Sequence, residues 1–287
     1  MIAKELKKLE IGNHQYKLIL LDTNAIREIV TNTNFSGKGF FVKFFMNEDL
    51  YAPCFSIYNV IELMPYEDIF KQFIDFFSKI PCIMIYSAKS IIYEEYNQYV
   101  NDQQFIISNE IANAFTPAID NESYNLRKFI EKMMLDIQLM QIIKNDIIEQ
   151  PSVVISWEQQ RIDAKKLLQK MKLPTNMIDD RYYRSQETVT IFKDLKNWGI
   201  SPKDDVDINA LPSLRIMEYS QFNRIHMTNK KVYPNDVMDV TISCIIPYMD
   251  AVITENFQAN VYKKAKRFIK QLNNLEIYTL KDIRAGE

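Results

Sequence analysis

The chain has few glycines, few histidines and no long apolar run, and each shortage excludes a class of protein. Its five glycines and ten prolines in 287 residues exclude collagen-like repeats and extended low-complexity linkers. The longest apolar stretches, such as 80–86 and 242–248, are far shorter than the roughly 20 residues that span a bilayer. The first residues alternate lysine with glutamate and lack the apolar centre of a signal peptide. We therefore expect a cytoplasmic chain with no membrane partner.

Cysteine and histidine are too sparse for a zinc site built from thiolates and imidazoles. Cys54, Cys82 and Cys244 lie far apart in apolar stretches without a CxxC pair, which is typical of buried apolar residues. Only His14 and His226 could supply imidazole. A metal ion would therefore be held by oxygen atoms, which favours Mg²⁺ or Mn²⁺. The net charge of −2 gives no overall attraction to nucleic acid, so a nucleic-acid binder would need locally concentrated basic residues.

The apolar pattern predicts an α/β fold with a central, mostly parallel sheet. A composition of 47% hydrophobic and 25% charged residues is typical of a globular protein. Short apolar runs separated by helical periodicity predict strands at 17–21, 51–53, 82–86, 251–254 and 276–279. Between 101 and 230 only helical periodicity is visible, with breaks at prolines such as Pro151. We therefore predict a discontinuous α/β domain, 1–100 and 231–287, and an all-helical insertion at 101–230.

Acidic residues lie beside two of these strands and on one predicted helix. Asp22 follows directly on the first strand, at the carboxyl end where α/β sheets bind ligands, although it could equally cap the next helix. Asp250 directly precedes the strand 251–254. Asp236 and Asp239 are three residues apart on a helix, so their like charges need water or a divalent cation nearby.

Three segments resemble, in order, the motifs of the PIN-domain nuclease family. The segment 18–24, LILLDTN, resembles the opening strand of the family. The segment 52–63 resembles the second motif, in which a helix after a short strand delivers a glutamate, here Glu62. The segment 239–254 resembles the third motif and its succeeding strand. The resemblance covers about half of the chain and implies a PIN-like three-layer fold.

The resemblance implies a metal-dependent nuclease, and within the family it favours an endoribonuclease that acts on RNA. Clustered carboxylates holding Mg²⁺ or Mn²⁺ can screen a phosphodiester and activate a water molecule. The implied residues are Asp22, Glu62, Asp239 and Asp250 for catalysis and metal binding, Asp236 and Glu255 as further ligands, and Asn24, Ser56, Thr254 and Asn256 to orient them. Many family members carry a further aspartate shortly after the threonine, where this chain has Glu255 and Asn256. The enzymatic prediction requires Asp22, Glu62, Asp239 and Asp250 to meet at the carboxyl edge of the sheet.

Two groups of basic residues could contact nucleic acid. One predicted helix just after Asn256 carries Lys263, Lys264, Lys266, Arg267 and Lys270, which form either a solvated face or a basic wall beside the acidic residues. The segment 181–184 alternates arginine with tyrosine, a composition suited to stacking on unpaired bases or to simple helix packing. The predicted nucleic-acid contacts are Lys263, Lys264, Arg267, Arg181 and Arg184.

A second class of function stays open. The chain could be a catalytically inactive PIN-fold module that binds RNA or a protein partner, with the helical insertion docking a regulator. A phosphatase of the haloacid-dehalogenase type is disfavoured, because Asn24 stands where that chemistry needs a second acid. The sequence does not decide between RNA and DNA, between a monomer and a homo-oligomer, or between a toxin, an RNA-processing enzyme and a defence factor.

Overall fold

A mostly parallel sheet forms the centre of the protein. The computed structural model describes residues 8–11, 14–46, 50–85, 87–103, 112–115, 125–174, 177–203 and 206–284. The strands are β1 (Lys8–Ile11), β2 (His14–Leu21), β3 (Tyr51–Ser56), β4 (Cys82–Ile85), β5 (Ala112–Phe115), β6 (Ala251–Thr254) and β7 (Glu276–Thr279). Their order is β5-β4-β3-β2-β6-β7, with β1 beside the start of β2. All neighbours run parallel except the pairs β1–β2 and β4–β5, which confirms the predicted α/β class.

The apolar run of β2 is continuous because helices cover both faces of the sheet. Leu18 and Leu20 pack into one core, whereas Ile19 and Leu21 pack into the core on the other face. All four side chains are at most 4% exposed. Alternate residues of a strand point to opposite faces, so a strand covered on both sides needs an apolar residue at every position.

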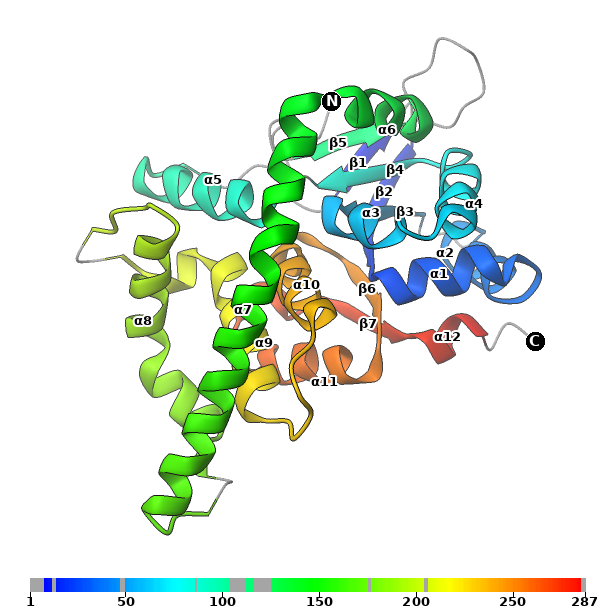
Figure 1. Ribbon diagram of the computed structural model, residues 1–287. Coiled ribbons are helices and arrows are strands. Elements are labelled where there is room, and N and C mark those ends of the chain that lie inside the picture. Colours follow the sequence, from blue (N-terminus) through cyan, green and yellow to red (C-terminus); the bar gives the residue numbers. More distant parts are fainter. Residues whose placement is uncertain are drawn as a thin grey trace.

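The helices are divided between the two faces (Figure 1). The face of Ile19 is covered by α1 (Thr23–Thr31), α2 (Lys38–Phe45), α3 (Ile57–Leu63), α4 (Glu67–Phe77), α6 (Leu126–Leu135) and α12 (Leu280–Arg284). The face of Leu18 is covered by α5 (Ala88–Val100), α9 (Pro212–His226), α10 (Pro234–Ile242), the 3₁₀ segment Ser243–Tyr248 and α11 (Asn256–Ala265). Two further helices, α7 (Ile137–Lys170) and α8 (Asp180–Asn197), pack against α9 from outside.

The segment 101–230 differs from its prediction in two ways. It is not all-helical, because β5 lies within it and pairs antiparallel with β4 at the edge of the sheet. The segment Ala-Asn-Ala-Phe lacks the β-branched residues by which other four-residue strands, at 251–254 and 276–279, are recognised. The predicted break at Pro151 is also wrong, since α7 continues through this exposed residue. In addition, α9 is buried in the same core as the sheet, with Leu214 and Ile216 at 0% exposure.

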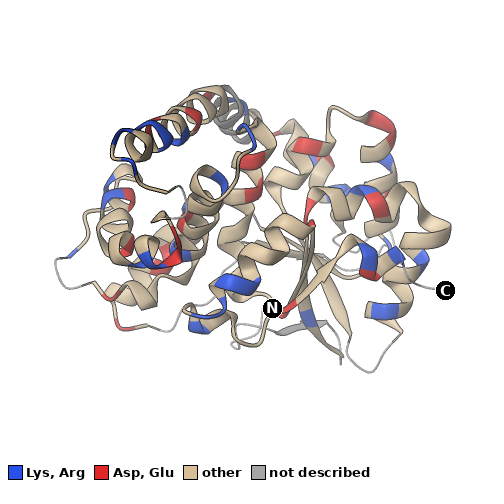
Figure 2. Ribbon diagram, turned by 90° about the horizontal axis from the view of Figure 1, so that it is seen from below, with Lys and Arg blue, Asp and Glu red and all other residues tan. Residues whose placement is uncertain are grey.

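Other expectations from composition can be compared with the structure. Cys54, Cys82 and Cys244 are free and buried, as predicted. Among the described helices, none combines the length and the apolar character needed to cross a membrane. Acidic and basic residues are interspersed along the ribbon (Figure 2), in keeping with the small net charge.

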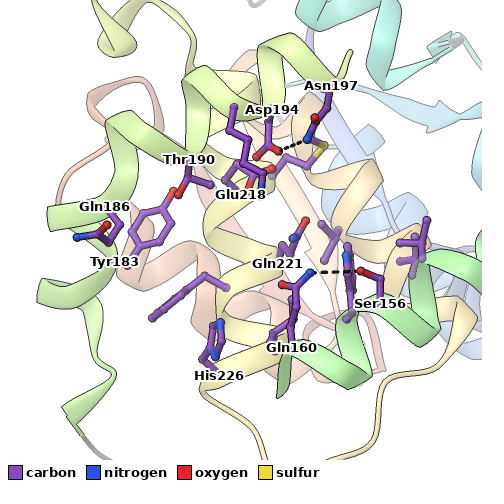
Figure 3. Close-up of a pocket in the computed structure, with 18 of the residues that line it drawn as sticks. Ser156, Gln160, Tyr183, Gln186, Thr190, Asp194, Asn197, Glu218, Gln221 and His226 are labelled. Atoms are coloured by element: carbon purple, nitrogen blue, oxygen red, sulfur yellow. Dashed lines mark hydrogen bonds between the residues drawn. The ribbon is translucent and has the colours of Figure 1, made fainter. Parts of the chain in front are cut away.

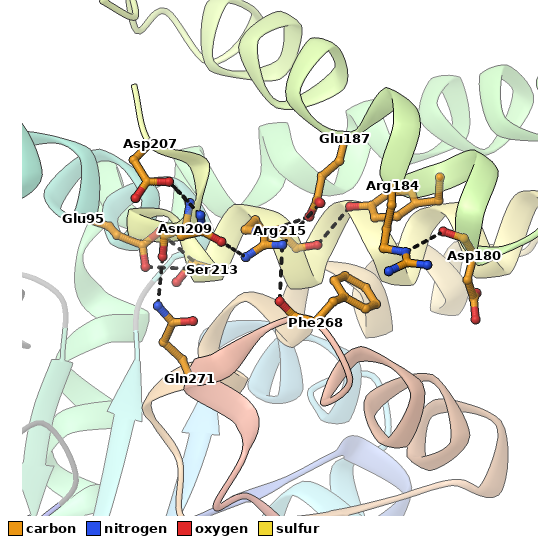
Figure 4. A network of polar contacts seen from close by, with 11 residues as sticks. Glu95, Asp180, Arg184, Glu187, Asp207, Asn209, Ser213, Arg215, Phe268 and Gln271 are labelled. Atoms are coloured by element: carbon orange, nitrogen blue, oxygen red, sulfur yellow. Dashed lines mark hydrogen bonds and ion pairs between the residues drawn. The ribbon is translucent and has the colours of Figure 1, made fainter. Parts of the chain in front are cut away.

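A buried ion pair joins α8 to α9 (Figure 4). Arg215 Nε donates to Glu187 Oε1 at 2.7 Å, and its Nη2 donates to Glu187 Oε2 at 3.2 Å. The two side chains are only 5% and 6% exposed. Arg215 Nη1 also donates to Asn209 Oδ1 at 2.8 Å. A guanidinium enclosed in this way depends on its carboxylate partner, because removing one member leaves an uncompensated buried charge.

We expect Glu187→Gln to lower the free energy of unfolding by about 3 kcal/mol, the typical cost of breaking a buried pair. Urea unfolding followed by circular dichroism measures the change. Arg181→Ala is the matched control, since it removes the exposed pair that Arg181 forms with Asp179 at 3.0 Å. Exposed pairs contribute little. Equal midpoints for Glu187→Gln and the control would contradict this role of the buried pair.

Candidate functional site

Asp22 lies at the carboxyl end of β2 and also caps α1. Its Oδ1 accepts a hydrogen bond from the Ala25 N–H at 2.6 Å, so the helix-cap interpretation is confirmed. Its Oδ2 accepts from the Glu255 N–H at 3.0 Å. One carboxylate therefore connects the chain after β2 with the chain after β6.

This position is the point where the strand order changes direction. From β2, the chain proceeds to β3 on one side, whereas β6 pairs with β2 on the other side. The register Leu21↔Ile253 places Asp22 beside Thr254, whose buried hydroxyl hydrogen-bonds the Asp22 carboxylate. Crevices at such switch points are the usual ligand sites of open α/β sheets.

Glu255 and Asn256 follow Thr254 at the rim of this crevice. Both are exposed, and Asn256 begins α11. Asn24 Nδ2 donates to Glu255 Oε1 at 2.6 Å. Asn24 thus orients Glu255, whereas the sequence predicted that it would support Asp22.

Glu62 is brought to the same place by α3. Ser56 caps this helix: its Oγ accepts from the Tyr58 N–H at 3.3 Å, and its own N–H donates to Asn59 Oδ1 at 2.7 Å. Glu62 lies in the last turn and accepts a hydrogen bond from the Thr23 hydroxyl. Asn59 Nδ2 in turn donates to Thr23 Oγ1 at 3.0 Å. Thr23, the residue next to Asp22, therefore holds the Glu62 carboxylate near Asp22.

Asp239, on α10, is the third carboxylate at this edge. Burial raises its pKa well above the ordinary range, and the negative charges of Asp22 and Glu62 raise it further. Burial likewise raises the pKa of Asp22 to about 6 and raises that of Glu62. Like charges that are half-buried together favour their protonated forms. Asp22, Glu62 and Asp239 therefore form one electrostatic group, which we call the acidic triad.

Two arginines partly neutralise this group, and the sequence did not indicate either. The positive charge of Arg27 lowers the pKa of Glu62. Arg224 Nη2 lies 3.0 Å from Asp236 Oδ1 and 3.8 Å from Asp239 Oδ2. Asp236 also accepts the Tyr233 N–H at 2.8 Å, so it is tied to α9 and to the start of its own helix.

Arg224 is 9% exposed, and its Nε has no hydrogen-bond partner. Its guanidinium stacks over the Phe257 ring, 4.1 Å from the centroid. Sequence reasoning missed Arg224, Thr23 and Asn59. Thr23 could have been found as the neighbour of Asp22, whereas Arg224 belongs to no motif and reaches the site only through tertiary packing.

Asp250 does not join the triad, which corrects its predicted role in catalysis and metal binding. It precedes β6 and therefore lies at the amino edge of the sheet, opposite Leu18. Its Oδ2 accepts the Leu18 N–H at 2.8 Å. Four residues of strand separate this level from Asp22, about 13 Å at 3.3 Å per residue. The requirement that all four carboxylates meet is therefore not met, because only Asp22, Glu62 and Asp239 lie at this edge.

The side chains as placed do not surround a metal ion. Within the described residues, no group of three or more His, Cys, Asp or Glu side chains has an arrangement that could hold one. Asp22 and Glu62 are directed toward N–H and hydroxyl donors of the protein itself. A shared cation would require these carboxylates to rotate away from some of those donors.

The predicted basic residues lie on α11, just after its end and on α8. Lys263, Lys264 and Arg267 line a cavity of about 480 Å³ together with Phe257, the ring that stacks on Arg224. The basic cavity and the acidic triad are therefore joined through the Phe257–Arg224 pair.

Arg181 and Arg184 occupy the first turn of α8 and are exposed. Asp180 in that turn accepts a hydrogen bond from the Tyr219 hydroxyl at 2.7 Å. Burial raises the pKa of Tyr219, and the positive charge of Arg267 partly offsets this effect. Tyr219 thus connects the first turn of α8 with the neighbourhood of Arg267, whereas Arg181 and Arg184 themselves donate to Asp179 and to the Asp180 carbonyl.

No protein-family model, curated protein or solved structure matches this chain. Its own residues and geometry therefore carry the functional argument.

Proposed function

We propose that the chain is a PIN-like, metal-dependent endoribonuclease of the cytoplasm. The observation that carries the proposal is the meeting of Asp22, Glu62 and Asp239 at the switch point of a parallel sheet, where each carboxyl has a raised pKa. Carboxylates in an α/β crevice with perturbed pKa values are characteristic of functional sites. The preference for RNA rests on the family resemblance of the three segments.

The chemistry of the triad suits a hard divalent cation, although within the described residues its side chains are not arranged to surround one. Mg²⁺ and Mn²⁺ take oxygen ligands, and the triad offers carboxylate oxygens in a setting without cysteine or histidine ligands. Bound there, such an ion would screen the phosphate and lower the pKa of an attacking water molecule. Asp22, Glu62 and Asp239 would hold it, with Asp236 and Glu255 adding negative charge at either side.

The other residues of the site hold this arrangement in place. Thr23 and Asn59 fix the Glu62 carboxylate by successive hydrogen bonds. Thr254 does the same for Asp22, and Asn24 holds Glu255. Because these partners come from three elements, α1, α3 and β6, they would keep the carboxylates near one another while a bound cation displaces some of these donors.

The basic cavity supports a path for the phosphate backbone. Lys263, Lys264 and Arg267 line one cavity with Phe257, the ring that stacks on Arg224, so a strand crossing the triad could place its next phosphates against them. Phosphate contacts of this kind fix position and give salt-dependent affinity. Arg181 and Arg184 could extend the same path.

A catalytically inactive RNA-binding or scaffolding module is the second candidate, and one observation favours it. Arg224 already supplies a positive charge to Asp236 and Asp239. If this guanidinium satisfies the acidic residues permanently, the site needs no metal ion. The two candidates differ in whether a divalent cation can compete with Arg224.

We expect Asp22→Asn to abolish metal-dependent cleavage of single-stranded RNA, because the change removes a central negative ligand with almost no change in shape. Cleavage would be measured with Mn²⁺, Mg²⁺ and EDTA on RNA and DNA of the same sequence. Asp250→Asn is the matched control and should retain activity, since an amide oxygen can still accept the Leu18 N–H. Undiminished cleavage by Asp22→Asn, or none by the unaltered protein, would refute the proposal.

The stabilising effect of Mn²⁺ should grow with pH. The folded-state pKa of Asp22, about 6, lies above its ordinary value of 3.8. Its carboxyl therefore favours the folded state when protonated, and the metal-free protein loses stability as the pH rises from about 4 through 6. Cations bind the ionised carboxylates, so millimolar Mn²⁺ should raise the melting midpoint more at pH 8 than at pH 5. An equal shift at both pH values, or no shift, would support the inactive module.

Replacing Lys263 and Arg267 together by alanine should weaken RNA binding and flatten its salt dependence. Each lost phosphate contact lowers the slope of log K against log salt by about 0.7 for a single strand. Binding would be measured by fluorescence anisotropy in EDTA, which prevents cleavage. The control replaces Lys71 and Lys79, exposed residues of the opposite face of the sheet, by alanine. Identical slopes for both double variants would remove the basic cavity from the RNA path.

A further inference from the structure

A second cavity, separate from the acidic triad, lies among α7, α8, α9 and α10 (Figure 3). Its volume is about 750 Å³, within the range of small-molecule sites. From α10, Val237, Val240 and Thr241 face this cavity, whereas Asp236 and Asp239 interact with Arg224. The two sites thus lie on different sides of α10.

The walls of this cavity are rich in aromatic side chains. Trp157, Tyr183 and Phe222 come from three different helices and are 7%, 4% and 8% exposed. Trp198 at the end of α8 is half-buried. Rings fixed on several helices can offer stacking surfaces to a planar ligand. Trp157 and Trp198 are the two tryptophans of the chain.

An acidic pair lies at one end of the cavity. Glu218 is 5% exposed, and its carboxyl shares a hydrogen bond with Asp194 on the neighbouring helix. Burial raises the pKa of Glu218 well above the ordinary range, and the negative charge of Asp194 adds to this effect. Asn197 Nδ2 donates to Asp194 Oδ1 at 3.2 Å. The two carboxyl groups therefore share a proton, which takes the place of hydrogen-bond donors from other residues. A ligand with adjacent N–H groups could supply such donors instead.

The remaining polar groups narrow the ligand class. Gln221 points into the middle of the cavity, and Gln160 lies across from it beside Ser156 (Figure 3). Side-chain amides can pair with both donors and acceptors on the edge of a base. Lys193 is the one lysine or arginine among the lining residues. A single cation is too little for a polyphosphate, so the ligand's binding group should be uncharged.

We propose that this cavity binds a guanine base stacked among the aromatic rings. The neighbouring ring and exocyclic N–H groups of the base donate hydrogen bonds to the Glu218–Asp194 pair. Guanine presents two neighbouring donors on one edge, whereas adenine and cytosine pair an amino group with a ring acceptor and uracil presents a single donor between two acceptors. The base could belong to a free nucleoside or to single-stranded RNA. Neither source requires that the triad be catalytic.

Tryptophan fluorescence tests the proposal directly, because Trp157 and Trp198 both line the cavity. The unaltered full chain would be titrated in EDTA with guanosine, adenosine, a single-stranded RNA containing one guanine and the same RNA with adenine in its place. We expect saturable quenching by the guanine ligands, with at least about tenfold weaker binding of the adenine ligands. Quenching by guanosine identifies a nucleoside site, and quenching by the guanine RNA alone identifies a site for a base within a strand.

Glu218→Gln should weaken the guanine ligand by about tenfold or more, since it keeps the size of the side chain but cannot become a carboxylate. Asp163→Asn, an exposed change on α7 that is outside the cavity, should bind normally. Trp157→Phe and Trp198→Phe assign the signal, and thermal melts verify that each variant is folded. The proposal is overturned by an absence of saturable quenching with every guanine ligand, by equal affinity for adenine, or by full affinity in folded Glu218→Gln. Asp22→Asn should bind guanine normally, which separates this outcome from failure of the nuclease proposal.

Discussion

The parallel pairing of β2 with β6 is the constraint on which the candidate site depends. It joins two parts of the chain that are far apart in sequence, so that the N–H of Glu255 reaches a carboxylate 233 residues earlier. Helix α10 precedes this second strand, separated from it by the 3₁₀ segment Ser243–Tyr248, and brings Asp239 with it. On the other side, β3 pairs with β2 and is followed by α3, which carries Glu62. Three distant segments thus meet because one central strand has two parallel neighbours.

Gathering these carboxylates has an electrostatic cost that the fold offsets in two ways. Short hydrogen-bonded connections, such as Asn59 to Thr23 to Glu62, stabilise the charged forms locally. Arg27 and Arg224 supply positive charge to the site. Each has a buried Nε without a hydrogen-bond partner, and Arg224 also forms ion pairs with Asp236 and Asp239. Whether a divalent cation can compete with Arg224 for these carboxylates distinguishes a nuclease from a module that only binds.

The sequence predicted the centre of the sheet well, because a strand buried on both faces must be apolar throughout, as 18–21 is. It also predicted three residues of the triad from the order of the motifs. The prediction failed at Asp250 because it considered only that this acidic residue lies beside a strand and ignored the direction of the strand. A residue before a parallel strand lies at the opposite edge of the sheet from a residue after one. Arg224 and β5 could not be predicted, since a long-range ion pair leaves no periodic signal and Ala-Asn-Ala-Phe lacks the β-branched residues that mark 251–254 and 276–279 as strands.

The two aspartates at opposite ends of the β2–β6 pair have a consequence for strand alignment. Asp22, after one strand, accepts an N–H that follows the other, and Asp250, before the second strand, accepts the N–H of Leu18. Each carboxylate thus forms a hydrogen bond across one end of the β2–β6 pair. A shift of one strand by a single residue would move every side chain of that strand to the other face of the sheet and break both hydrogen bonds. Asp250 therefore helps to fix the register of β2 with β6. Through this register, a residue at the amino edge of the sheet determines how the residues around Asp22 are aligned at the carboxyl edge.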